Sequence, residues 1–279
     1  MVEQKIRRAN VQANGLNLFY RDTGKGEKTM LCLHGRWGRG ETWTDFMSLY
    51  RDRYRIIAPD QRGHGLSDRP VARYDKKEMA RDMYELMRSL DIGEYIVVGH
   101  SMGGTVAAHL AAIYPHVVKA AAILDSTAAG QEHPSDVPPE EIEVKDALTE
   151  DWPTPYSTYN DAVRHLEGIF GPSGVRYFSE SLIETTTGYD FLFSRYSMAA
   201  IEQYSCSWFD ILPQIKCPVL LVRARESWCL SRETAEMMRS RVKDCTYFEV
   251  SKSDHMVYAD NPDEFYSGFE KFLDKVEEE

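Results

Sequence analysis

The sequence predicts an α/β fold built on a mostly parallel β-sheet that is covered by helices on both faces. Short apolar runs alternate with amphipathic helical patterns along most of the 279 residues. Strands buried on both faces give nearly continuous apolar runs, and Tyr95–Val98 is such a run. Residues 127–209 break the alternation, and a segment of that length is more than a loop requires. We therefore expect one sheet domain with an insertion.

The predicted elements follow in order along the chain. The strands are expected at Leu16–Tyr20, Thr29–Leu33, Tyr54–Ala58, Tyr95–Val98, Ala120–Leu124, Val219–Val222 and Thr246–Val250. The helices are expected at Glu41–Tyr50, Lys76–Leu90, Gly103–Tyr114, Arg232–Arg241 and Pro262–Val276. Met79, Met83 and Leu86 recur at helical spacing in the second helix, and Pro115 ends the third.

The insertion is expected to form a helical cap over the sheet domain, which would comprise residues 1–126 and 210–279. It opens with several prolines among carboxylates and then becomes aromatic and helix-like. Aromatic side chains dominate both cores and pockets, so most of them should pack between cap and sheet. Some should line a cavity, since ligand pockets often lie between domains.

Composition excludes several classes of protein. A net charge of −11 argues against a nucleic-acid or anionic-membrane partner. The acidic stretch from Pro139 to Asp151 is interpreted as solvated surface. The five cysteines have no CxxC spacing, which leaves no zinc or redox signature. Met1–Arg8 lacks the apolar stretch of a signal peptide, and no membrane span is apparent, so a cytoplasmic protein is expected. A homodimer is compatible with the sequence.

The pentapeptide Gly99-His100-Ser101-Met102-Gly103 is the most informative motif. It follows an apolar run and precedes a helix-like stretch, which is the setting of a Gly-x-Ser-x-Gly nucleophile elbow. A glycine-rich turn without catalytic meaning is the alternative. The flanking elements favour Ser101 as a nucleophile.

Two further segments have the chemistry that a nucleophilic serine needs. His255 follows the last predicted strand, where it could reach a serine on a central strand as general base. His34-Gly35-Arg36-Trp37-Gly38 forms a turn after an early strand. An oxyanion hole requires two backbone NH donors, and Met102 and Arg36 are the candidates.

These motifs together resemble the α/β-hydrolase superfamily over nearly the whole chain. The ordered set is His34-Gly35, Asp60–Ser67, Gly99–Gly103, Asp254-His255 and Asn261–Phe265. The resemblance implies an eight-stranded sheet, no metal and no organic cofactor. Epoxide hydrolases and haloalkane dehalogenases of this fold carry Asp where this chain has Ser101, so the resemblance points to the serine branch.

The third member of the triad departs from the family pattern. Most relatives carry an Asp shortly after the strand that matches Val219–Val222, and this chain has none there. Either Glu226, close to the usual place, or Asp125, at the end of the preceding strand, could accept the hydrogen bond from the histidine. Trp228 stands about where the Asp would fall, which favours Asp125. A third carboxylate, Asp254, adjoins the histidine.

The expected function is hydrolysis of a carboxylic ester or lactone with apolar groups. The substrate pocket is expected to include Trp37, His100, Trp152, Trp228 and Met256. One alternative is carbon-carbon bond hydrolysis of a ring-cleavage product, with the Arg36 side chain pairing with a substrate carboxylate. Relatives with that activity usually have Asn where His100 stands. A small-molecule receptor on the same fold is the other alternative.

Overall fold

A twisted sheet forms the centre of the molecule in the computed structural model, which describes residues 6–278. Within those residues eight strands pair in the order β1-β2-β4-β3-β5-β6-β9-β10. β1 and β2 pair antiparallel, β2 pairs antiparallel with β4, and the remaining pairs are parallel. The strands are β1 Arg7–Ala13, β2 Leu16–Asp22, β3 Lys28–Leu33, β4 Tyr54–Pro59, β5 Tyr95–His100, β6 Val118–Leu124, β9 Val219–Ala224 and β10 Cys245–Val250. The predicted mostly parallel, eight-stranded α/β fold is confirmed.

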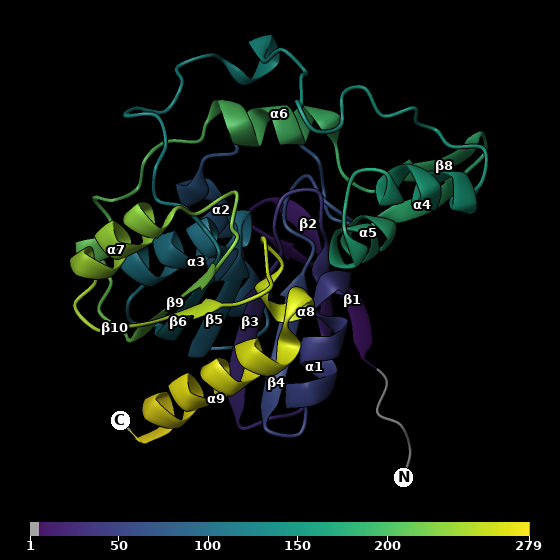
Figure 1. Ribbon diagram of the computed structural model, residues 1–279. Coiled ribbons are helices and arrows are strands. Elements are labelled where there is room, and N and C mark those ends of the chain that lie inside the picture. Colours follow the sequence, from purple (N-terminus) through teal and green to yellow (C-terminus); the bar gives the residue numbers. More distant parts are fainter. Residues whose placement is uncertain (1–5, 279) are drawn as a thin grey trace.

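Helices cover both faces of this sheet (Figure 1). On one face α1 and α9 pack together, with the rings of Phe46 and Phe269 5.4 Å apart. On the other face α2 packs on α3, where Tyr84 and Tyr114 stack at 4.0 Å. The helices of the sheet domain are α1 Thr44–Tyr50, α2 Lys76–Ser89, α3 Met102–Ile113, α7 Arg232–Arg241, α8 Val257–Asp260 and α9 Pro262–Glu278. Short 3₁₀ turns lie at η1 Gly40–Trp43, η2 Pro139–Glu141 and η3 Leu212–Gln214.

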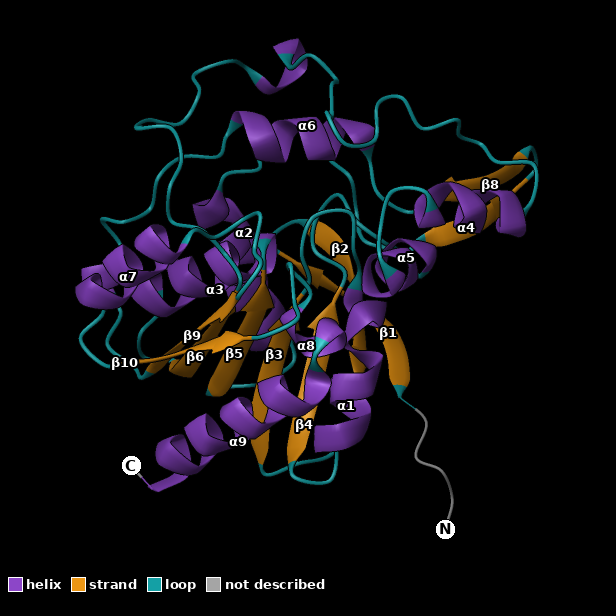
Figure 2. Cartoon of the chain, viewed as in Figure 1, coloured by secondary structure: helices purple, strands orange, loops and turns teal. Residues whose placement is uncertain are grey.

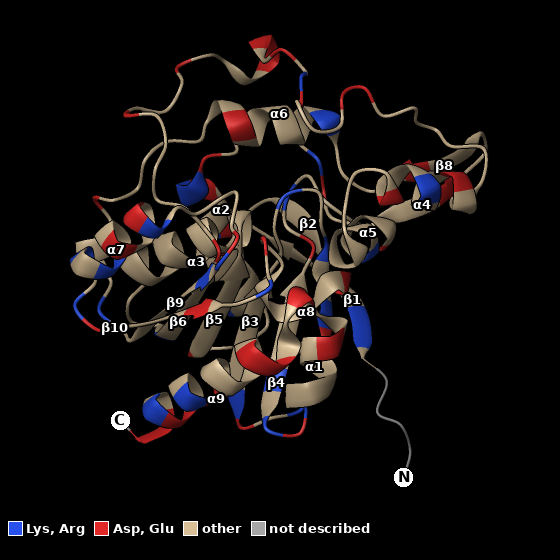
Figure 3. Cartoon of the chain, viewed as in Figure 1, with Lys and Arg blue, Asp and Glu red and all other residues tan. Residues whose placement is uncertain are grey.

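Local sequence explains where these elements begin. β5 and β9 are buried at every position, as expected for central parallel strands. Asp75 caps α2 by accepting a hydrogen bond from the backbone NH of Glu78, and Ser231 caps α7 in the same way from Thr234. Lys, Arg, Asp and Glu lie mainly on helices and loops, and β5 has none (Figure 3). No helix within residues 6–278 is long and apolar enough to cross a membrane.

The insertion between β6 and β9 contains helices and also a hairpin (Figure 2). We call residues 127–209 the cap segment. Its elements are α4 Tyr159–Glu167, α5 Pro172–Ser179, β7 Leu182–Thr185, β8 Gly188–Phe191 and α6 Arg195–Gln203. Tyr177 on α5 donates a hydrogen bond to the carbonyl of Arg36, which follows β3. The cap segment therefore lies against the carboxyl ends of the central strands.

Two features differ from the sequence-based expectations, and a third expectation falls partly outside the described residues. β1 was not predicted, because only Ala9, Val11 and Ala13 of this edge strand point toward the core and its other residues are polar. The β7/β8 hairpin lies in a stretch whose aromatic residues suggested helix. The expectation about a signal peptide concerns Met1–Arg8, of which residues 1–5 lie outside the described residues.

Candidate active site

Ser101 occupies a strained turn between β5 and α3. Its φ and ψ are 53° and −121°, a conformation that L residues rarely adopt. The turn depends on two glycines, since a Cβ on Gly99 would overlap the carbonyl of Gly103 and a Cβ on Gly103 would overlap the carbonyl of Leu33. Strand and helix therefore approach closely enough to expose the Ser101 side chain, which lines a cavity beneath the cap segment.

A buried pair of side chains lies beside this serine. Nδ1 of His255 is 2.7 Å from Oδ2 of Asp125, and Asp125 is fully buried at the end of β6. The carboxylate also accepts hydrogen bonds from the backbone NH of Ala224 at 2.9 Å and from the hydroxyl of Ser227 at 2.7 Å. With Nδ1 as donor to Asp125, Nε2 of His255 is left as an acceptor for a proton.

The other carboxylates are placed differently. Oε2 of Glu226 accepts a hydrogen bond from the backbone NH of Ser253 at 2.9 Å, and the Glu226 backbone NH donates to the Ser253 carbonyl. Glu226 thus holds the loop that carries His255 through two hydrogen bonds to Ser253, and within residues 6–278 it makes no hydrogen bond to His255 itself. Asp254 lines the cavity, and its pKa is raised by burial and by the neighbouring Asp260.

The loop that carries His255 is organised by Asp260. Oδ2 of Asp260 accepts hydrogen bonds from the Ser253 hydroxyl at 2.8 Å and from the Met256 backbone NH at 3.1 Å. His100, the last residue of β5, also contacts this loop: its Nε2 lies 3.1 Å from the His255 carbonyl and donates a hydrogen bond to it. Burial and the neighbouring His255 hold the pKa of His100 well below its usual value, so this ring stays neutral.

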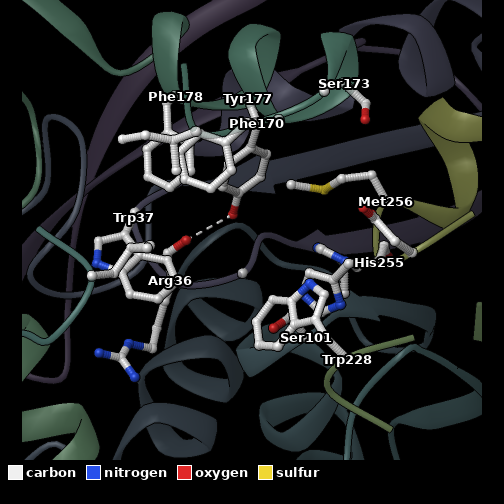
Figure 4. Close-up of a pocket in the computed structure, with 17 residues that line it drawn as sticks. Arg36, Trp37, Ser101, Phe170, Ser173, Tyr177, Phe178, Trp228, His255 and Met256 are labelled. Carbon is white, nitrogen blue, oxygen red and sulfur yellow. Dashed lines mark hydrogen bonds between the residues drawn. The ribbon is translucent and has the colours of Figure 1, made fainter. Parts of the chain in front are cut away.

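Ser101 and His255 line the same cavity, on the side opposite the aromatic rings of α5 (Figure 4). Among the residues that the structure describes, no hydrogen bond joins the Ser101 hydroxyl to His255. Catalytic hydrogen bonds are often long in the absence of substrate and tighten when it binds. The backbone NH groups of Arg36 and Met102 also donate no hydrogen bond within residues 6–278, and Met102 begins α3.

The cavity has a volume of about 320 Å³ and mainly aromatic and aliphatic walls. Among the predicted pocket residues Trp37, His100, Trp228 and Met256 line it. The ring of Trp228 lies 4.6 Å from that of His255, and this side chain is 68% exposed at the mouth of the cavity. Sequence reasoning did not identify the residues contributed by α5 and its neighbours, which are Leu148, Ile169, Phe170, Ser173, Tyr177 and Phe178.

Trp152 is the exception among the predicted pocket residues, because it does not line this cavity. Its ring packs against Phe178 at 5.1 Å and against Phe191 at 5.1 Å, in the aromatic core of the cap segment. Phe178 and Phe170 stand between Trp152 and the cavity, since both of them line it. The aromatic composition of the insertion did not distinguish an aromatic residue in the wall from one behind it.

The Arg36 side chain also differs from expectation. Its guanidinium points away from Ser101 (Figure 4) and is paired with two carboxylates of the cap segment. Nη2 lies 2.9 Å from Asp146, while Nη1 pairs with Glu202 on α6. Asp146 belongs to the acidic stretch interpreted as solvated surface, yet its side chain is only 3% exposed. The guanidinium is therefore already engaged and gives no support to a role in pairing with a substrate carboxylate.

No group of three or more His, Cys, Asp or Glu side chains in the described part of the chain is arranged to hold a metal ion.

A mostly parallel sheet with a serine elbow after a central strand and a histidine loop after its last strand defines the class of α/β hydrolases. The family model described as alpha/beta hydrolase fold matches residues 28–165. The 2-(acetamidomethylene)succinate hydrolase of Mesorhizobium japonicum is 30% identical over 274 residues, which cover 95% of this chain and 94% of that protein. The serine hydrolase BPHL of Mus musculus is 27% identical over 281 residues, which cover 95% and 86%.

Solved structures agree with the sequence relatives. The crystal structure of E-2-(acetamidomethylene)succinate hydrolase superposes with a TM-score of 0.81 and 25% identity, covering 97% of this chain and 100% of that one. The protein belongs to the α/β-hydrolase family and is a hydrolase.

Proposed function

We propose that this protein is a serine hydrolase that cleaves a carboxylic ester or lactone with apolar groups through an acyl-enzyme intermediate. The observation that carries the proposal is the buried 2.7 Å contact between His255 and Asp125, beside a serine held in a strained elbow. A nucleophile, a base and a carboxylate that orients the base are the three groups that acyl transfer requires.

In this mechanism Ser101 Oγ attacks the acyl carbon while Nε2 of His255 takes the hydroxyl proton. The bond to the leaving alcohol breaks, and the imidazolium returns that proton to the alcohol oxygen. Water then attacks the acyl-enzyme, with His255 again accepting a proton, and the carboxylic acid leaves as Ser101 recovers its hydrogen. Asp125 fixes the imidazole tautomer and stabilises its charged form.

The oxyanion that forms in both steps is assigned to the backbone NH groups of Arg36 and Met102. Neither NH is engaged by another described residue, so both are available to donate. Met102 is the first residue of the 12-residue helix α3, whose N-terminal dipole adds to the stabilisation of negative charge.

The cavity walls favour a substrate without charge near the reacting carbon. Arg36 is the only Lys or Arg among the described residues that line the cavity, and its guanidinium is neutralised by Asp146 and Glu202. Asp254 adds a carboxyl group to the wall. A succinate, which the relative from Mesorhizobium japonicum is named for, carries two carboxylates that would be desolvated here without a partner. An ester or lactone with aliphatic or aromatic substituents fits these walls.

Covalent labelling tests the proposal directly. A fluorophosphonate should add one phosphonyl group to Ser101, as located by peptide mass spectrometry, and Ser101→Ala should remain unlabelled. A nitrophenyl ester should give a burst of nitrophenol close to one equivalent, or steady turnover, that the variant lacks. Labelling without turnover of any ester or lactone would instead indicate a receptor, and turnover by Ser101→Ala within about tenfold of the parent would exclude the acyl-enzyme.

A further inference from the structure

The oxyanion loop, residues 34–38, is held by the cap segment at four points. The guanidinium of Arg36 is paired with Asp146 and Glu202, and its carbonyl accepts a hydrogen bond from the Tyr177 hydroxyl at 3.1 Å. The indole NH of Trp37 donates to Oδ2 of Asp146 at 2.8 Å, and the carbonyl of Trp37 accepts from the Ser181 hydroxyl at 2.9 Å. Both side chains and both carbonyls of these two residues are thus bonded to the cap segment.

The conformation of this loop is one that the chain does not prefer by itself. Trp37 has a φ of 63°, which is unfavourable for a bulky residue and persists only where surrounding contacts enforce it. Gly35 passes so close to the nucleophile that an added Cβ would lie 3.1 Å from that of Ser101, and one on Gly38 would overlap the Tyr177 ring. His34 is held by Gln61 of the sheet domain, whereas the side chains and carbonyls of Arg36 and Trp37 are held by the cap segment.

Asp146 is the centre of these contacts. Its side chain is 3% exposed and accepts hydrogen bonds from Arg36, Trp37 and the Thr149 hydroxyl. Glu202, in contrast, is 70% exposed, so solvent screens its pairing with Arg36. Removing a buried carboxylate that satisfies three donors takes the partner away from all three of them, which costs more than the loss of an exposed pair.

We propose that Asp146 is a positioning residue that, with Tyr177 and Ser181, holds the oxyanion loop so that the Arg36 backbone NH faces the reacting oxygen. The proposal rests on the proposed function. The hydrogen bonds that hold the cap segment against residues 34–38 are then the same ones that complete the oxyanion hole, so the two form together. A substrate that displaces the cap segment to enter meets an incomplete hole until the segment returns.

The test compares Asp146→Asn with Glu143→Gln. The latter makes the same kind of change in the same stretch of chain, at a side chain that is 73% exposed and, within residues 6–278, forms an ion pair only with Lys145. Asp146→Asn should lower kcat by about 10- to 100-fold with KM changed less than about threefold, because the loss of one oxyanion donor costs about 10²- to 10³-fold. Glu143→Gln should stay within about twofold. Ser181→Ala, which releases the Trp37 carbonyl, should lower kcat in the same direction and carries the test if Asp146→Asn does not fold.

A transition-state analogue separates positioning from a merely structural role. An alkyl trifluoromethyl ketone forms a hemiketal oxyanion with Ser101, so its inhibition constant should rise in parallel with the fall in kcat/KM. The affinity for the product alcohol should stay unchanged. A lowered thermal midpoint with kcat and the inhibition constant unchanged in both variants would overturn the proposal. Failure of the unmodified protein to react with a fluorophosphonate or an ester would instead refute the proposed function, which keeps the two failures distinct.

Discussion

Asp125 is the side chain whose surroundings bear most directly on the chemistry. It is fully buried, and three donors converge on it from two segments: the Ala224 backbone NH and the Ser227 hydroxyl at the end of β9, and the His255 ring. These three hydrogen bonds hold the carboxylate in one orientation, so its contact with the imidazole does not depend on a mobile rotamer. Glu226 has a different partner, the Ser253 backbone NH, and braces the loop without contacting the ring.

Replacing each carboxylate by its amide should rank the two residues. Asp125→Asn should lower kcat by at least about 100-fold, because an amide supports the imidazolium poorly and can select the wrong tautomer; in the well-studied serine protease that serves as the reference case the corresponding change costs about 10⁴-fold. Glu226→Gln should cost much less. Steady-state kinetics together with thermal midpoints will show this, and the reverse ranking in two folded variants would move the acid to Glu226.

The sequence could predict Ser101 and His255 as candidates but could not separate Asp125 from Glu226. Both follow a strand, and which of the two strand ends faces the histidine depends on the strand order β5-β6-β9 and on the path of the histidine loop. Asp146 could not be predicted for a related reason. A carboxylate in an acidic stretch has the pattern of a solvated face, and its partners Arg36 and Trp37 lie more than 100 residues away in the chain.

At the scale of elements, the close approach of β5, α3 and β3 positions Ser101, the proposed nucleophile. Gly103→Ala should lower the free energy of unfolding by about 2 kcal/mol or more, because the new methyl group would overlap the backbone of Leu33 and His34. Gly93→Ala is the matched control, since nothing lies within 4 Å of its added Cβ. Its effect should stay within about 0.5 kcal/mol. Urea unfolding measures both values, and equal effects would contradict the close packing described for the elbow.

Tyr177 and Phe178 of helix α5, together with Phe170 two residues before the helix, give the cavity an apolar wall. Nitrophenyl esters from acetate to hexanoate should therefore show a rising kcat/KM, by up to about fourfold per methylene, since a buried methylene contributes about 0.8 kcal/mol. The rise should stop where the cavity of about 320 Å³ is filled. Rates of alkaline hydrolysis of the same esters are the control for intrinsic reactivity. A flat or falling series, with no aromatic ester reacting faster, would contradict an apolar substrate pocket.

For the whole molecule, the periodic pattern of the sequence was sufficient to predict the sheet and its covering helices. Central parallel strands such as β5 and β9 are buried at every position, so each gives a continuous apolar run that is visible in the sequence. β1 escaped prediction because most of its residues are polar and exposed, and the β7/β8 hairpin because its strands are only four residues long with at most one buried position each. The fold was thus most predictable where the core is deepest.

Buried histidines make the stability of the whole protein depend on pH. Burial lowers the pKa of His34 and of His109 to about 4. Below about pH 6.5 these two imidazoles are protonated in the unfolded chain but stay neutral in the folded protein. The free energy of unfolding therefore falls as the pH drops from 7 toward 4. Each ring should contribute a loss of about 2 kcal/mol between pH 7 and pH 5.

Urea unfolding of the parent and of His109→Gln at pH 7 and pH 5 measures this effect. The variant should lose less stability on acidification than the parent, by up to about 2 kcal/mol. Buried carboxyl groups such as Asp60 titrate in both proteins, so the difference between them isolates one imidazole. Parallel losses in the two proteins would show that His109 is protonated in the folded state.

The seat of Asp125 at the end of β6 has a consequence for how this protein can change. In the proposed mechanism the loop after β9 supplies no reacting group, and the side chain of Ser227 in this loop donates a hydrogen bond to the acid. Its neighbour Trp228, exposed at the mouth of the cavity, therefore supplies no reacting group, although its ring packs 4.6 Å from that of His255. In the proposed mechanism a substitution at this position changes the entrance to the cavity without removing a reacting group, which makes the loop a natural site for directed evolution of substrate range.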